Sequence, residues 1–97
     1  MENKELKKIA TKISNYLATT DNPDSIYHFL RDLLSENEII EFSRRFEVAI
    51  LLDQKISYTE IEKQTGMSST TMARISKFLH NGNGGYQDAI IKIKSQK

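Results

Sequence analysis

The chain has 97 residues, of which 38% are hydrophobic and 28% are charged, a composition typical of one soluble globular domain. It contains no cysteine, which excludes a disulfide framework and a thiolate metal site, and no apolar run approaches the roughly 20 residues that span a bilayer. The formal net charge is only +1, so any affinity for nucleic acid must depend on where the charges lie.

Two amphipathic helices are predicted in the first third of the chain. The first runs from about Lys4 to Thr19, because apolar residues recur there at three- and four-residue steps: Leu6, Ile9, Ala10, Ile13 and Leu17. Asn22 can cap a second helix, and Pro23 suits its first position. Its apolar stripe consists of Ile26, Phe29, Leu30, Leu33 and Leu34. These stripes favour a dimer, although they can equally pack within one chain.

A long third helix is predicted from Ser35 to about Asp53. Ser35 and Glu38 have the spacing of a capping box, in which each side chain bonds the backbone N–H of the other residue. Leu34 and Ile39 are spaced as the matching hydrophobic staple. The main buried face is expected to be Ile39, Phe42, Phe46, Ala49 and Ile50, widened by Ile40, Val48, Leu51 and Leu52. So many apolar positions indicate a central helix.

The region of about 57–80 has the outline of a helix-turn-helix. Ser57 and Glu60 form a second predicted capping box, and Gly66 ends the short helix that follows, since glycine adopts a left-handed backbone without steric cost. Ser68 caps a longer helix that extends to about His80. A glycine-rich loop and a last helix from about 86 to 94 follow, with Ala89, Ile90 and Ile93 on one side. We therefore predict an all-α fold of about six helices in a single domain, 1–97.

The faces of the helix after Ser68 differ in chemistry. Met72, Ile75 and Leu79, with Phe78 beside them, are expected to pack on the two preceding helices. The remaining surface has no acidic residue, and its small, hydroxyl and cationic side chains suit entry into a major groove. The predicted DNA-binding residues are Thr59, Lys63, Ser68, Ser69, Thr70, Thr71, Ala73, Arg74 and Lys77. The alternative is a helical protein-interaction module, in which the hydroxyls only cap helices and the basic face is solvated.

Several short segments together resemble the Trp repressor superfamily. They are Leu34–Glu38 (LSENE), Arg44–Arg45, Ser57–Ile61 (SYTEI), Gly66 and Ser69–Ser76 (STTMARIS). The stretch from Arg74 to Tyr86, ending in NGGY, is most similar to the YerC/YecD-type branch of Trp-repressor-related proteins. The resemblance implies a bacterial transcriptional regulator that forms an intertwined, all-helical homodimer and binds double-stranded DNA.

The resemblance also implies an effector site, which this sequence matches only in part. Arg45 and Arg74 stand where the Trp repressor holds its indole between two arginines. Ile75 replaces a small residue, and Phe78 replaces a serine that helps to hold the ligand amine. Phe78 is expected to fill the indole slot. An effector pocket of Arg45, Arg74 and Phe78 is therefore doubtful, and tryptophan is not the expected effector.

No other pattern in the sequence indicates a metal-binding or catalytic site. His28 and His80 are far apart and have no partner at metal-ligand spacing, so no metal or other cofactor is expected. The nearby carboxylates Glu36, Glu38 and Glu41 are better explained by capping and by the helix dipole than by catalysis. No nucleophile and base pair is evident, so we expect no enzyme activity. The first residues lack the apolar stretch of a signal peptide, and we expect a cytoplasmic protein.

Overall fold

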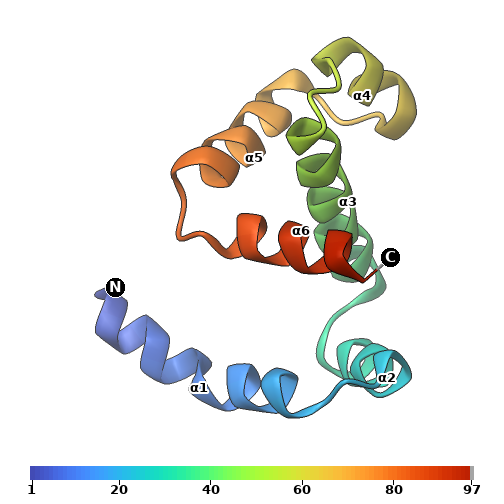
Figure 1. Cartoon of the computed structure of the whole chain (residues 1–97). Coiled ribbons are helices and arrows are strands. Elements are labelled where there is room, and N and C mark those ends of the chain that lie inside the picture. The colour runs from blue at the N-terminus through green and yellow to red at the C-terminus, as the bar shows by residue number, and fades with distance from the viewer. Residues whose placement is uncertain (97) are drawn as a thin grey trace. The chain divides into compact units, whose positions relative to one another are not determined.

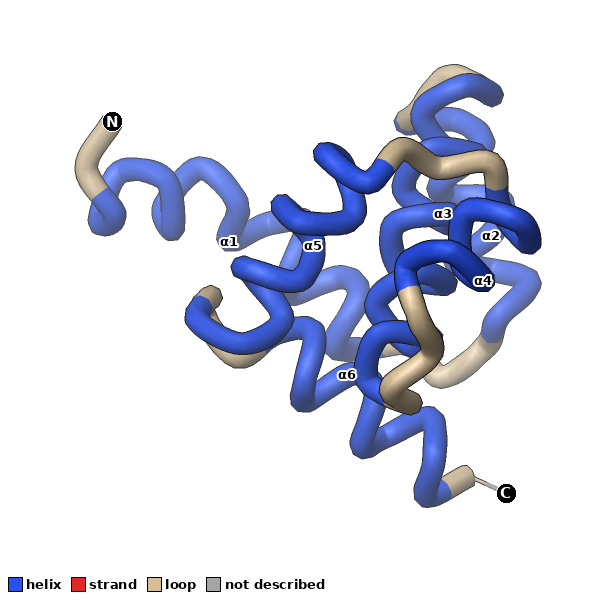
Figure 2. The backbone as a smooth tube through the Cα atoms, turned by 90° about the horizontal axis from the view of Figure 1, so that it is seen from above, coloured by secondary structure: helices blue, strands red, loops and turns tan. Residues whose placement is uncertain are grey.

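Helices make up all of the regular structure in residues 1–96, which the computed structural model describes (Figure 1 and Figure 2). The six helices are α1 (Asn3–Thr19), α2 (Pro23–Leu33), α3 (Glu36–Asp53), α4 (Tyr58–Thr65), α5 (Ser69–Asn81) and α6 (Gly85–Ser95). The predicted all-α fold is thereby confirmed. The backbone contacts divide the chain into two compact units, one of residues 1–39 and one that begins at Ile40. Each unit is described by itself.

The first unit contains α1, α2 and the first turn of α3. As predicted, Asn22 caps α2, since its Oδ1 accepts hydrogen bonds from the backbone N–H of Asp24 (2.9 Å) and of Ser25 (3.3 Å), and Pro23 opens the helix. The rings of Tyr16 in α1 and Phe29 in α2 lie 4.7 Å apart between centroids, in a tilted arrangement. This aromatic pair joins the two helices within the unit.

The apolar stripe of α1 remains largely uncovered in the single chain. Neither α1 nor α2 has a buried residue. Ile9 is 67% exposed, and Leu6, Ile13 and Leu17 are also exposed. A helix with this much exposed aliphatic surface gains little hydrophobic stabilisation unless another surface covers it.

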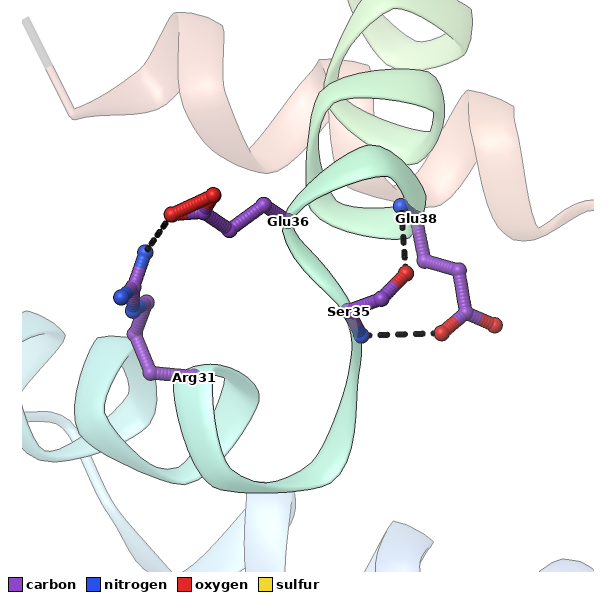
Figure 3. Close-up of polar contacts among 4 residues, drawn as sticks. All are labelled: Arg31, Ser35, Glu36 and Glu38. Atoms are coloured by element: carbon purple, nitrogen blue, oxygen red, sulfur yellow. Dashed lines mark hydrogen bonds and ion pairs between the residues drawn. The ribbon is translucent and has the colours of Figure 1, made fainter.

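The predicted capping box at the start of α3 is complete (Figure 3). The backbone N–H of Ser35 donates to Glu38 Oε1 at 2.9 Å, and the backbone N–H of Glu38 donates to Ser35 Oγ at 3.2 Å. The bond from the Ser35 backbone N–H, and secondarily the Ser35 hydroxyl, lowers the pKa of the Glu38 carboxyl. Arg31, at the end of α2, forms an ion pair with Glu36 at 3.4 Å, which links the two helix ends across the short connection.

The core of the second unit draws on all four of its helices. Its buried residues are Val48, Ala49, Leu52, Ile61, Met72, Ile75, Leu79 and Ile90. The predicted buried face of α3 is partly wrong, because Phe42 is 44% exposed and Ile40 is exposed as well. The buried residues of α3 all lie between Val48 and Leu52, so the core covers only the C-terminal part of this helix.

Two backbone hydrogen bonds that span three and five residues, in place of the four of an α-helix, close the C-terminal end of α3. The backbone N–H of Lys55 donates to Leu52 O at 3.0 Å, and that of Ile56 donates to Leu51 O at 3.1 Å. This is a Schellman motif, and it places Lys55 in the left-handed region at φ 66°. Nearby, Lys94 Nζ in α6 lies 2.8 Å from Asp53 Oδ2 and lowers the pKa of that carboxyl.

The second predicted capping box is only half formed. Ser57 Oγ accepts from the backbone N–H of Glu60 at 3.2 Å, as expected for the start of α4. The Glu60 carboxylate, however, accepts a hydrogen bond from Gln64 Nε2 at 3.2 Å instead of returning to the Ser57 backbone. Gln64 is one turn further along α4, so it competes for the same carboxylate. Ser57 alone caps this helix.

Candidate nucleic-acid interface

The predicted helix-turn-helix consists of α4, a three-residue connection from Gly66 to Ser68, and α5. Gly66 ends α4 in the left-handed region at φ 74°, and its N–H donates to Glu62 O at 2.8 Å. Ser68 Oγ accepts from the backbone N–H of Thr71 at 3.3 Å and so caps α5. In addition, the N–H of Met67 donates to Thr65 Oγ1 at 3.2 Å. The turn is therefore fixed by local hydrogen bonds.

One face of α5 holds the helix on the core. Met72, Ile75 and Leu79 are buried, as the apolar spacing predicts. Phe78 does not join them, because it is 57% exposed. The prediction that Phe78 packs beside these residues is wrong for the single chain. Three buried anchors at three- and four-residue steps are enough to set the rotation of α5, and they turn its polar positions outward.

The outward face of α5 is accessible along its length. Every residue predicted to contact DNA is exposed: Thr59, Lys63, Ser68, Ser69, Thr70, Thr71, Ala73, Arg74 and Lys77. Among residues 1–96, no carboxylate pairs with Arg74 or Lys77. The hydroxyls of Ser68 and Thr71 lie 3.1 Å apart and bond each other, whereas the Thr70 hydroxyl has no such bond within the described residues. Thr70 is therefore better placed than Ser68 or Thr71 to bond a base.

A cavity of about 350 Å³ lies beside this face. It is lined by Glu41, Arg45, Thr71, Arg74, Ile75, Phe78 and Tyr86. The predicted effector residues Arg45, Arg74 and Phe78 are thus brought together, with Phe78 forming part of the wall and leaving open space between them. A second hollow shares Phe78 and Tyr86 and is otherwise lined by Asn83 and Gly85.

Sequence reasoning missed two residues of the cavity wall. Glu41 Oε1 lies 2.6 Å from Arg45 Nη2, and the Arg45 guanidinium also lies over the Phe42 ring at 5.5 Å from its centroid. The four-residue spacing of Glu41 and Arg45 on one helix is a signal that could have revealed this pair. Tyr86 reaches the cavity because α6 packs against the other helices of the second unit, and no local sequence pattern predicts that packing.

Comparison with known proteins identifies relatives that span most of the chain. The family model described as Trp repressor protein matches residues 5–94. The uncharacterized protein YerC of Bacillus subtilis (strain 168) is 32% identical over 83 residues, which are 86% of this chain and 80% of YerC. The crystal structure of a candidate Trp repressor from Staphylococcus aureus superposes with a TM-score of 0.85 and 28% identity, and the match covers 97% of this chain and 95% of that one.

These matches confirm the resemblance that the sequence motifs indicate. Across residues 1–96, no helix has both the length and the apolar character that crossing a bilayer requires.

Proposed function

Because the chain belongs to the Trp repressor family, in its YerC-type branch, we propose that it is a sequence-specific DNA-binding transcriptional regulator. The single observation that carries the proposal is the outward face of α5. Thr70, Arg74 and Lys77 are all exposed there, and no carboxylate within residues 1–96 neutralises the two cations. Such a helix can enter a major groove with its hydroxyls on base edges and its cations on phosphates.

The start of α5 supports phosphate binding as well. The first backbone N–H groups of a helix have no partner within the helix, and the helix dipole adds a partial positive charge there. Ser68 occupies one of these donors, on Thr71. The N–H groups of Ser69 and Thr70 are left to face a phosphate oxygen, while the side chain of Thr70 reaches toward the groove.

We propose that the active form is a homodimer and that the whole chain acts as one domain within it. The exposed aliphatic stripe of α1 supports this, because a second copy of the chain would supply the apolar surface that the stripe lacks. A dimer also presents two copies of α5 to successive turns of the major groove. We infer no enzymatic role and a cytoplasmic location, as befits a regulator of transcription.

We propose further that tryptophan is not the effector. Glu41 already pairs with Arg45, so a ligand carboxylate would have to displace it. Ile75 and Phe78 line the α5 side of the cavity, where the family resemblance implies a small residue and a serine. Isothermal titration with L-tryptophan should therefore give no heat of binding at millimolar concentrations, and a signal at one site per chain would contradict this.

The test of DNA binding uses two exposed α5 residues with different proposed partners. Binding sites are first selected from a random duplex pool, and affinities are then measured by fluorescence anisotropy over a range of salt. Lys77→Ala should weaken binding to every duplex and reduce the log–log salt slope by about 0.9 for each chain that contacts it. Thr70→Ala should leave the slope unchanged and alter sequence preference by about 1 kcal/mol or more.

The alternative function, a helical protein-interaction module, gives a different result. It predicts no duplex binding even at low salt and no sequence enrichment from the pool. Equal losses for both variants on selected and random duplexes would contradict base reading by Thr70 while leaving phosphate binding in place.

A further inference from the structure

Positive charge is distributed unevenly along the chain. The helix-turn-helix, residues 57–81, has three cations and two glutamates and so a net charge of only +1. In contrast, α1 has a single acid, Glu5, against four lysines and so a net charge of +3. Those lysines are Lys4, Lys7, Lys8 and Lys12. Since the whole chain has a net charge of +1, the rest of the molecule is acidic overall, and α1 is its most cationic element.

The four lysines share one face of α1. They follow each other at steps of three, one and four residues, with the uncharged Thr11 and Asn15 on the same side. The apolar stripe that begins at Leu6 lies on the opposite side. All four lysines are exposed, and none pairs with a carboxylate within residues 1–96. We call Lys4, Lys7, Lys8 and Lys12 the lysine face.

We propose that the lysine face of α1 binds the phosphate backbone of duplex DNA without regard to sequence and supplements the contacts of α5. The inference rests on the proposed function. Its physical basis is that the helix-turn-helix has three permanent cations in each chain, Lys63, Arg74 and Lys77, and two glutamates that offset them, whereas a DNA-binding protein often neutralises about 6–10 phosphates. The lysine face supplies the missing charge, and its flexible ammonium groups suit contacts that need no fixed geometry.

A lipid surface is the other polyanion that a cationic amphipathic helix can bind, and the proposed dimer disfavours it, because its second copy would cover the apolar stripe. A helix that lies on a membrane inserts its apolar face among the acyl chains. In the single chain the apolar stripe of α1 is largely exposed, and Tyr16 beside it packs against Phe29 of α2. The proposed dimer would cover the rest of the stripe. The lysine face remains available to DNA, which needs no apolar insertion.

The experiment compares two double variants that remove the same charge. Lys8→Gln with Lys12→Gln acts on the lysine face, and Lys55→Gln with Lys92→Gln acts on exposed lysines elsewhere. Glutamine is nearly as good a helix former as lysine, so α1 should stay folded, which circular dichroism can verify. Affinity for a mixed-sequence duplex is measured by anisotropy across a salt series, and sites are reselected from the random pool.

The lysine-face variant should lower the salt slope by about 1.8 per chain, at about 0.9 for each phosphate that is no longer neutralised. Between about 50 and 200 mM salt, the wild type should then lose roughly tenfold more affinity than this variant for each chain that contacts the duplex. The selected sequence should not change. The control variant should keep the wild-type slope. Equal decreases of the slope in both variants would overturn the proposal, because only net charge would then matter.

Two other results would also overturn it. One is an unchanged slope in the lysine-face variant together with a loss of binding to phosphatidylcholine vesicles rich in phosphatidylserine, which would assign the face to membranes. The other is a wild-type protein that binds no duplex at low salt, in which case the proposed function fails as well. An unchanged slope with intact, Thr70-dependent sequence selection would refute the lysine face alone.

Discussion

The helices α3 and α4 are each followed by a residue in the left-handed backbone conformation. That residue is glycine after α4 and lysine after α3. Gly66 closes α4 at φ 74°, and Lys55 follows α3 at φ 66°. A residue with a Cβ is strained in this region by about 1–2 kcal/mol, while glycine lowers folded-state stability by about 0.5–1 kcal/mol through the extra freedom of the unfolded chain. The two positions should therefore respond in opposite directions to exchange between glycine and another residue.

The magnitudes follow from the local surroundings. A Cβ at Gly66 would meet no atom within 4 Å, so Gly66→Ala adds backbone strain alone and should destabilise the protein by about 1 kcal/mol. Lys55→Gly should stabilise it by about 0.5–1 kcal/mol, because the strain is relieved and the exposed side chain buries nothing. Lys55→Ala is the control, since it removes the same charge near Asp53 but keeps the strain.

Urea unfolding at one fixed protein concentration measures these differences, because a dimer makes stability depend on concentration. A change of about 1 kcal/mol shifts the urea midpoint by roughly 0.5 M at an unchanged slope of about 2 kcal/mol/M. Lys55→Ala should leave the midpoint close to that of the wild type. If Lys55→Gly and Lys55→Ala gave equal shifts, charge rather than backbone conformation would be responsible, and the reasoning would fail.

Two further predictions concern the core and the pH dependence of stability. Met72→Ala should lower the free energy of unfolding by about 2–5 kcal/mol in the same urea assay, since Met72 is fully buried, whereas the exposed Ala73→Ser on the same helix should cost little; comparable losses would refute the assigned core. The pKa values of Glu38 and Asp53 are both lowered by folding, so their stabilisation is present above the ordinary carboxyl pKa and is lost as pH falls through the lowered pKa. The melting temperature should therefore fall less steeply with decreasing pH in the double variant Glu38→Gln with Lys94→Met than in the wild type. The same pH dependence in both proteins would contradict the interactions of Glu38 with Ser35 and of Asp53 with Lys94.

Local signals predicted the ends of the helices well. Asn22, Ser35, Ser68 and Gly66 all act within four residues of their own positions, so the sequence contains nearly everything that determines them. Even so, the Ser57 box is incomplete, because Gln64 supplies a competing donor to the Glu60 carboxylate. Local reasoning fails where more than one partner is within reach.

The errors at Phe42 and Phe78 have a different origin. Phe78 lies beside the correctly identified Ile75 and Leu79, and Phe42 lies one turn before the half-buried Phe46, yet both are exposed. Periodicity gives the direction of a side chain and not the extent of the surface that faces it. The cavity illustrates the same limit. Arg45 and Arg74 came from a family resemblance, while Tyr86 depends on how α6 returns to the second unit, which only the tertiary structure shows.

The attachment of α6 has a consequence for motion. This helix contributes a single buried side chain, Ile90, and two polar links, from Gln87 Nε2 to Leu79 O at 2.7 Å and from Lys94 to Asp53. Segments held by so few interactions detach at a small fraction of the global unfolding free energy. Amide hydrogens of α6 should thus exchange with solvent before those of α5. Tyr86 belongs to α6 and forms part of the wall of the cavity that Arg45 and Arg74 line. Each detachment of α6 would therefore remove that part of the wall and open the cavity further to molecules from solvent.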